Sequence, residues 1–397
     1  MKLNTETFRL EDAGSFGKKA LMAGIVGLLI SVAGYFVNAD QFWRSYLTAF
    51  TFWTSIGLGG MFFVLVKHLA GAEWSVVLRR LAENFMITLP IMFVFFLPIL
   101  FGSHHLYEWT HTEVVAKDPI LSAKSGYLNM TFFTIRTVLY FAIWTIFGRM
   151  LYKMSIGQDG GDQSKNNRMR QLSAPGMILF AFSITYASFD WIMSLQPHWF
   201  STIFGVWNFA GSLLNFLAML VLIAIYLRKR GVLDNVISID HFHDLGKLQF
   251  AFTIFWAYIA FSQFFLIWYA NVPEETIFFL KRWEGSWMYV SIGLLVCHLM
   301  IPFILLIPRA NKRNLTIMKF VAIWFLFMHW VDLYWNIFPT WHDAHHGVVM
   351  SGLWVDAATI LGIGGIFLWY FWMLLGKQAL AAHKDPSFEK SMHHVNL

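Results

Sequence analysis

The sequence predicts an all-α integral membrane protein that crosses the bilayer ten times. Of its 397 residues, 57% are hydrophobic, 18% are aromatic and only 13% are charged, which is about half the charged fraction of an ordinary soluble domain. The apolar runs are about 20 residues long, the length at which a helix crosses a hydrocarbon core of ~30 Å. Cys297 is the only cysteine, so an intrachain disulfide and a cysteine-based zinc site are excluded.

Ten segments meet this length criterion, and we expect each of them to be a transmembrane helix. They are about twice as long as the strands of a membrane β-barrel and are apolar on every side. Lys18 and Lys19 precede the first segment, whose ~18 apolar residues exceed the core of a typical signal peptide, so we expect this segment to be retained. The predicted spans are 19–36, 45–66, 84–102, 127–148, 174–195, 200–227, 248–269, 286–307, 316–337 and 353–376.

The distribution of Lys and Arg predicts the orientation of the spans. The two tails and the alternate loops between them hold 23 of the 29 Lys and Arg residues. Cytoplasmic segments of multi-pass proteins carry this excess, so both termini are expected in the cytoplasm. The net charge of +6 is then a consequence of topology, and we expect lipids rather than nucleic acid around the chain.

A repeated motif predicts two four-helix bundles. Residues 52–57 (FWTSIG) in the second span resemble residues 200–205 (FSTIFG) in the sixth, and a pair of small residues and a basic loop follow each motif. Small residues let helices approach closely in lipid, so we expect spans 2–5 and spans 6–9 to form two bundles with two peripheral helices outside them. The expected divisions of the chain are 1–40, 41–196, 197–340 and 341–397.

Two segments between spans have a distinctive composition. Residues 73–83 (EWSVVLRRLAE) have the pattern of a short amphipathic helix on the cytoplasmic surface of the membrane. Residues 157–167 (GQDGGDQSKNN) have the composition of a flexible linker.

Six charged or titratable side chains fall within the predicted spans, where such groups usually face a cavity or one another because burial in hydrocarbon is costly. The helical rise of 1.5 Å per residue places most of them in the outer half of the membrane. No carboxylate falls in the inner half, so we expect a polar cavity that opens outward, and we expect Arg136 to pair with Asp190 or with another outer carboxylate. The six are Arg136, Asp190, His298, His329, Asp332 and Asp356, and their neutral companions are Asn208, Asn215 and Gln263.

Helical spacing places some of these residues on common faces. His329, Asp332 and Asn336 stand at positions i, i+3 and i+7 on one face of the ninth span, and Ser183, Tyr186 and Asp190 have the same spacing on the fifth span. A histidine beside a carboxylate can exchange protons near neutral pH, as a proton relay or a quinol oxidation site requires. The two groups can equally satisfy each other as structural partners, and the sequence leaves both interpretations open.

Metal and haem sites are not expected in this chain. His342 and His346 are four residues apart in the last outer loop, a spacing that can bind a metal on a helix, but in a loop the pattern is more typical of solvated histidines. Only His298 and His329 lie deep within spans, which is too few for the paired axial ligands of a b-type cytochrome. We therefore expect no cofactor that is bound by this chain alone.

Several long motifs resemble one known family. They are residues 188–194 (SFDWIMS), 197–205 (PHWFSTIFG), 244–263 (DLGKLQFAFTIFWAYIAFSQ), 267–275 (IWYANVPEE) and 332–335 (DLYW). Through these motifs, essentially the whole chain resembles the ActF family, whose members are membrane subunits of bacterial alternative complex III. That family belongs to the NrfD-like superfamily of polysulfide-reductase membrane subunits, and the complex contains two NrfD-like subunits. The resemblance implies two four-helix bundles with two peripheral helices, and a location in the bacterial inner membrane.

The resemblance also implies a function and a set of partners. The complex of that family oxidises membrane quinol (a quinone such as menaquinone is the candidate ligand) and passes electrons to cytochrome c or an oxidase. Its haem and iron–sulfur clusters lie in partner subunits, namely an iron–sulfur protein and multihaem cytochromes. The further partners are a sister NrfD-like membrane protein and, in some cases, a terminal oxidase. The expected role of this chain is to support proton transfer and assembly, and the alternatives are that it carries a quinol site itself near the periplasm or that it is a scaffold. The proton-path candidates carried over are Asp190, Arg136, His329, Asp332, Asp356 and His298, and the candidates for a polar lining or quinone site are Gln263, Asn208, Tyr186 and Asn336.

Overall fold

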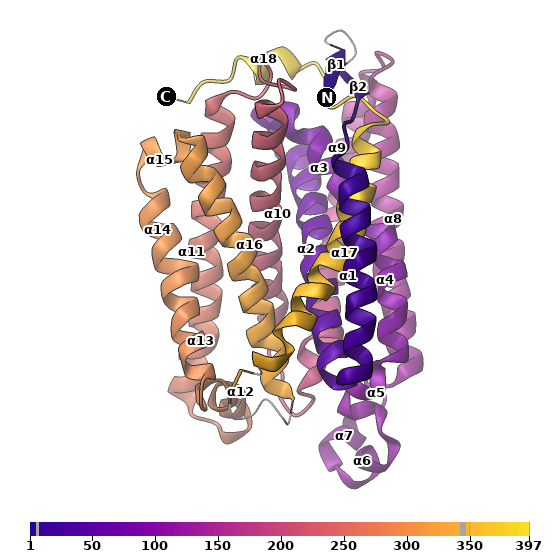
Figure 1. Ribbon diagram of the computed structural model, residues 1–397, viewed down its shortest axis with the longest axis vertical. Helices are drawn as coiled ribbons and strands as arrows, with labels where there is room; N and C mark the ends of the chain where they lie inside the picture. The colour runs from indigo at the N-terminus through magenta and orange to yellow at the C-terminus, as the bar shows by residue number, and fades with distance from the viewer. Residues whose placement is uncertain (5–7, 342–346, 349, 397) are drawn as a thin grey trace.

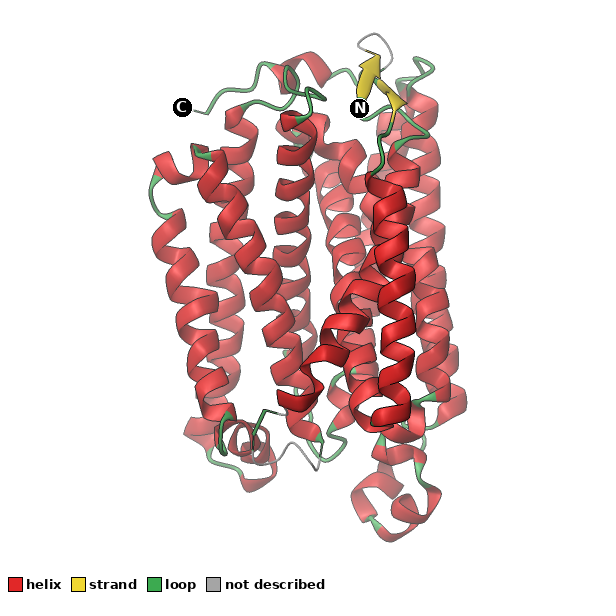
Figure 2. Ribbon diagram, viewed as in Figure 1, coloured by secondary structure: helices red, strands yellow, loops and turns green. Residues whose placement is uncertain are grey.

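A computed structural model of the protein describes residues 1–4, 8–341, 347–348 and 350–396. The described chain is almost entirely helical, and a two-stranded antiparallel hairpin of β1 (Lys2–Asn4) and β2 (Arg9–Asp12) lies at its N-terminus (Figure 2). It contains ten helical segments that are long and apolar enough to cross a membrane. The predicted fold class, an all-α membrane protein with ten spans, is confirmed.

The ten spans are built from single helices, apart from the third and the eighth, which are composite. The third joins two helices at Ile87 and Thr88, and the eighth contains a π-helical turn, η4, which is a feature often found at functional sites. The spans are α1 (Phe16–Val37), α2 (Ala39–Ala70), α3 (Val76–Met86) with α4 (Leu89–Phe101), α8 (Met130–Gln158), α9 (Ser164–Trp191), α10 (Phe204–Lys229), α11 (Ile239–Ala270), α13 (Trp287–Gly293) with η4 (Leu294–Met300) and α14 (Ile301–Leu306), α16 (Leu315–Ile337) and α17 (Leu353–Leu375).

Short helices lie in the connections. They are α5 (Ser103–Leu106), α6 (Thr112–Lys117), α7 (Pro119–Lys124), α12 (Pro273–Trp283), α15 (Arg309–Arg313) and α18 (Phe388–Met392), with single 3₁₀ turns η1 (Glu73–Ser75), η2 (Glu108–Thr110), η3 (Met193–Leu195), η5 (Phe338–Thr340) and η7 (Met350–Gly352). Both chain termini lie at one end of the molecule, which we call the terminal face, and α6, α7 and α12 lie at the other end, the opposite face (Figure 1).

Two rings of four spans form the body of the protein. In the first ring α2 contacts α3 and α4, α4 contacts α8, α8 contacts α9, and α9 returns to α2. The second ring is closed in the same way by α10, α11, the composite span α13–η4–α14 and α16. The rings meet where α2 lies against α10, and a Cβ on Gly59 of α2 would stand only 2.3 Å from Cβ of Phe216 on α10. Glycine at this position is what allows the two bundles to approach so closely.

The helices α1 and α17 pack against each other outside the rings and attach to α2. The residues that α1 buries are all small: Gly17, Gly24, Gly27, Ser31 and Gly34. A Cβ on Gly27 would lie 2.5 Å from the backbone nitrogen of Gly362, and a Cβ on Gly365 would lie 2.3 Å from that of Gly24. Backbone therefore packs directly on backbone where α1 meets α17, as in other small-residue helix pairs in membranes.

Three features of the chain differ from the expectations. The motif at 52–57 begins 13 residues into α2, whereas the motif at 200–205 begins four residues before α10, so the two motifs do not occupy equivalent positions. The segment 73–83 is not a surface helix, because every residue of α3 is buried under the C-terminal segment and the neighbouring helices. The segment 157–167 is helical at both ends, because α8 continues to Gln158 and α9 begins at Ser164, so the connection between the two helices is only residues 159–163.

Candidate functional site

Polar side chains gather where the two bundles meet, and we call this group the inter-bundle seam. It comes from α2, α10 and α16. One part of it is a chain of hydrogen bonds: the Asn215 amide nitrogen donates to Ser55 Oγ at 2.8 Å, and Ser55 Oγ lies 3.2 Å from His329 Nε2. His329 is 1% exposed. The members of the seam are Thr54, Ser55, Asn208, Ser212, Asn215, His329, Asp332 and Asn336.

Asp332 is the carboxyl group of the seam. The indole nitrogen of Trp256 donates to its Oδ2 at 3.2 Å, and the Asn336 amide nitrogen donates to its backbone oxygen at 2.8 Å. Asp332 is 3% exposed, and no residue within the described ranges forms an ion pair with it. A helical rise of 1.5 Å per residue from Leu315 places Asp332 about 26 Å from the terminal-face end of α16, in the half of the membrane near the opposite face.

The sequence-based face of His329, Asp332 and Asn336 is therefore one cluster in the structure. Gly211 of α10 packs against it: a Cβ there would lie 2.9 Å from His329 Nδ1 and 3.7 Å from Asp332 Oδ2. The absence of a side chain at Gly211 brings α10 directly onto the imidazole and the carboxyl group.

His298 lies beside this cluster on the π-helical turn. Its ring centroid is 4.0 Å from that of Trp256, the residue that also donates to Asp332. His298 is fully buried, and neither ring nitrogen has a hydrogen-bond partner in the described part of the chain. Trp256 thus stands between a buried imidazole and a buried carboxyl group.

Arg136 and Asp190 form a separate and closed ion pair in the first bundle. Arg136 Nε and Nη2 donate to the two carboxylate oxygens of Asp190 at 2.8 and 2.9 Å, and Tyr140 Oη donates to Asp190 Oδ2 at 2.7 Å. The guanidinium also stacks on Tyr127, with its carbon 3.8 Å from the ring centroid. The expected counter-ion relation is confirmed, and its bidentate geometry with full hydrogen bonding is that of a structural pair.

The remaining candidates lie outside the seam. Asp356 is buried at the start of α17, where the Gln41 amide nitrogen lies 3.4 Å from its Oδ2. Gln263 accepts a hydrogen bond from Ser201 and so ties α11 to the segment before α10. Tyr186 is 43% exposed on the outer surface of α9, so it does not line a polar cavity.

A second buried polar group, at the terminal face, was not expected. Arg79 Nη1 lies 2.5 Å from Asp385 Oδ2, and Arg79 Nε lies 3.3 Å from Glu83 Oε1. The Ser155 hydroxyl donates to Glu83 Oε2 at 2.7 Å. Burial raises the pKa of Asp385, but Arg79 and Lys67 lower it by more, so this pKa lies below its usual value. We call this group the terminal-face network; its members are Lys67, Arg79, Arg80, Glu83, Ser155, Gln158, Asp159 and Asp385.

Glu83 corrects the expectation that no carboxylate lies in the half of the membrane next to the termini. It is fully buried and lies about 15 Å along the span that begins at Glu73. The spacing of Arg79, Arg80 and Glu83 at i, i+1 and i+4 was visible in the sequence, but it fits a membrane-surface helix equally well. An apolar layer lies between Glu83 and the seam, because Phe85 and Phe216 pack on consecutive glycines of α2, one turn from Ser55.

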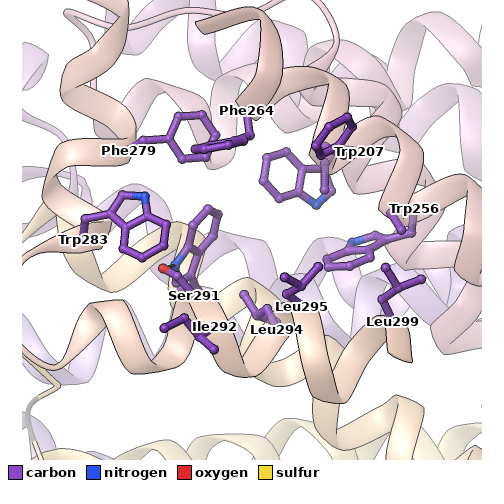
Figure 3. A pocket seen from close by; sticks show the side chains of 14 residues that line it. Trp207, Trp256, Phe264, Phe279, Trp283, Ser291, Ile292, Leu294, Leu295 and Leu299 are labelled. Carbon is purple, nitrogen blue, oxygen red and sulfur yellow. Dashed lines mark hydrogen bonds between the residues drawn. The ribbon is translucent and has the colours of Figure 1, made fainter. Parts of the chain in front are cut away.

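A large apolar pocket opens in the second bundle beside the seam. Its volume is about 400 Å³, within the ~300–1,000 Å³ typical of small-molecule sites. Figure 3 shows Trp207 and Trp256 along one side, with Phe279 and Trp283 at the other end. Trp207 also lines a small cavity that reaches His329 and Asp332, so its indole ring is the wall between the apolar pocket and the seam.

Arg282 closes the end of the second bundle near the opposite face. Its guanidinium is fully buried and donates to the backbone oxygens of Trp335 and Asn336 at 3.1 and 2.9 Å. A cation at the C-terminal end of α16 stabilises the unpaired carbonyl groups there.

No group of three or more His, Cys, Asp or Glu residues within the described ranges has the geometry of a metal site. His342 and His346, where the sequence favoured solvated histidines over a metal site, lie outside the described residues. Two comparisons with known proteins were also negative: no protein-family model matches the chain, and no curated protein is significantly similar to it in sequence.

Proposed function

We propose that the chain is a membrane component of a respiratory quinol-oxidising complex, in which it supports proton transfer and assembly. The observation that carries the proposal is the seam itself, where Asp332 and His329 are buried together at the junction of two bundles and no cation of the described residues pairs with the carboxyl group. Ionisable residues inside membranes are rare and typically mark proton relays or substrate paths. The resemblance of the motifs to the ActF family of alternative complex III supplies the class of complex.

The Lys and Arg distribution supports an orientation for this proposal. With both termini in the cytoplasm of a bacterium, the terminal face is cytoplasmic and Asp332 lies in the periplasmic half of the inner membrane. Protons released by quinol oxidation leave on that side. The partners would be a sister NrfD-like membrane protein, together with the iron–sulfur protein and the multihaem cytochromes that hold the iron–sulfur clusters and the haem.

The test is a set of carboxyl variants in the assembled complex. Asp332→Asn should lower turnover and proton release roughly 10²-fold, the lower end of what a positioned general acid or base contributes, and Asp332→Glu should recover part of this loss. Asp356→Asn is the matched control, because that carboxyl group is equally buried but lies outside the seam. Normal turnover of assembled Asp332→Asn would refute the proton role.

The apolar pocket favours a second candidate function, a quinol site in this chain. Its aromatic lining suits a flat ring and an isoprenoid tail, and Trp256 on its wall is hydrogen-bonded to Asp332. A photoreactive quinone analogue should then label α11 or η4 in the complex, and Ala260→Trp, which fills the pocket, should abolish this labelling. Labelling confined to the other proteins of the complex would exclude this candidate.

A further inference from the structure

Two small cavities in the inter-bundle seam share Asn208 as a lining residue. The first has a volume of about 10 Å³ and is lined by Asn208, His329, Asp332 and Asn336, together with Phe204, Trp207 and Leu333. The second has a volume of about 20 Å³ and is lined by five apolar residues and by six polar residues of α2, α9 and α10: Thr51, Thr54, Ser55, Ser188, Asn208 and Ser212. A space of about 10–15 Å³ that the centre of a water molecule can reach is enough for one water, provided that two to four polar partners surround it.

Residues that line both cavities carry buried polar atoms that have no hydrogen-bond partner in the described part of the chain. At the first, His329 Nδ1 and Asn336 Oδ1 are buried and make no hydrogen bond within the described chain. At the second, Thr54 Oγ1 is in the same situation. The great majority of buried polar atoms in native proteins are paired with protein or with ordered water, so these atoms indicate a ligand that can both donate and accept.

The hydrogen bonds of Ser55 favour one tautomer of His329. The single hydroxyl proton of Ser55 is donated to the backbone oxygen of Phe52 at 2.7 Å, and the hydroxyl oxygen accepts from the Asn215 amide at 2.8 Å. The remaining lone pair of Ser55 Oγ faces His329 Nε2 at 3.2 Å. This arrangement favours a His329 ring that is protonated on Nε2, which leaves Nδ1 as an acceptor.

We propose that the seam binds two ordered water molecules, one in each cavity, and that the first bridges the carboxyl group of Asp332 to Nδ1 of His329. The carboxamide of Asn208 can donate and accept at the same time, so it joins the two waters into one hydrogen-bonded chain that ends at Thr54. The binding of water rests on the cavities and on the unpaired polar atoms of their lining residues, whereas its use in proton transfer rests on the proposed function.

The first water gives Asp332 a specific proton acceptor. When the carboxylic acid gives its proton to the water, the water passes one of its own protons to His329 Nδ1. The products are a carboxylate and an imidazolium, so charge is conserved and no other reactant is needed. The imidazolium keeps its Nε2 hydrogen bond to Ser55 throughout.

The test combines a high-resolution density map of the assembled complex with nitrogen-15 NMR of His329. The map should show a water within hydrogen-bond distance of both His329 and Asp332, and the NMR shifts should be those of a neutral ring protonated on Nε2 with Nδ1 as an acceptor. Asn208→Leu should remove the waters of both cavities. Ser188→Ala should affect only the second cavity, because Ser188 does not line the first.

The outcomes separate this inference from the proposed function. A map that resolves other buried waters but shows none beside His329, or a ring protonated on Nδ1, would overturn the inference whatever Asp332 does in turnover. If both waters are present and Asp332→Asn turns over normally, the water site stands and the proton role falls.

Discussion

The ion pair of Arg136 and Asp190 gives a quantitative prediction for the stability of the first bundle. Asp190 is fully buried and Arg136 is 6% exposed, and Asp190→Asn leaves the guanidinium in the membrane without its counter-charge. Breaking a buried pair by removing one partner typically costs about 3–5 kcal/mol. Arg136 lies only six residues, about 9 Å, from the start of α8, so its side chain can extend toward the interface, and we expect the lower end of this range.

The assay is thermal or denaturant unfolding of the purified protein in lipid nanodiscs. Asp190→Asn should lose about 3 kcal/mol, whereas the double variant Arg136→Leu with Asp190→Leu should recover most of the loss, because replacing a whole buried pair by apolar residues is often neutral. Asp332→Asn, which leaves no cation unpaired, is the control and should change stability by less than about 1.5 kcal/mol. Equal stability of Asp190→Asn and the unaltered protein, or a double variant weaker than the single one, would refute a structural role for the pair.

Three further predictions concern the terminal face, the opposite face and the contact between α1 and α17. Asp385→Asn should weaken the hydrogen bond to Arg79 by about 1.5–3 kcal/mol. Amide hydrogen exchange in residues 386–396 should then be roughly ten- to hundredfold faster. Unchanged exchange would contradict the role of the terminal-face network in holding the C-terminal segment. The pKa of Asp118 is lowered by its hydrogen bond with His198 and by the backbone N–H groups of Leu121 and Ile120. The protection of these two amides from hydrogen exchange should therefore persist above pH ~4 and be lost as the pH falls through the lowered pKa. The variant Asp118→Asn should show no such pH dependence. Gly365→Ala should reduce cross-linking between cysteines introduced in α1 and α17, because the new Cβ would collide with the backbone of Gly24. Gly293→Ala is the control and should not reduce it, because a Cβ there has no described atom within 4 Å.

Composition and periodicity were sufficient to predict the ten spans. Their signal is the length of the apolar runs, which depends only on the thickness of the bilayer. The pairing of Arg136 with Asp190 was also predictable, because two opposite charges at similar depth in neighbouring spans have few other ways to be compensated.

The terminal-face network could not be predicted, because an amphipathic pattern does not distinguish a helix on the membrane surface from one covered by another part of the chain. In the structure α3 is covered by the distant C-terminal segment through Asp385 and Ser391. The partner of His329 was missed for a related reason. Serine within a span usually bonds to its own helix, as Ser55 also does through Phe52, so its second contact with α16 leaves no trace in the sequence.

The exposure of Tyr186 has a geometric cause. Three positions on a helix advance by about 300°, so Tyr186 is turned about 60° from Ser183, which is buried against Trp144 of α8. Positions that share a helix face by their spacing in the sequence can therefore include both buried residues of α9 and residues at the edge that faces lipid. Only the position of α8 decides between them.

Infrared difference spectroscopy of the assembled complex during quinol oxidation tests the central claim most directly. If Asp332 exchanges a proton in turnover, the carbonyl stretch of a protonated carboxyl group should change on oxidation, shift in deuterated water, and disappear in Asp332→Asn while remaining in Asp356→Asn. A spectrum in which that band is absent, or is the same in Asp332→Asn, would show that the carboxyl group at the junction of the two bundles takes no part in proton transfer.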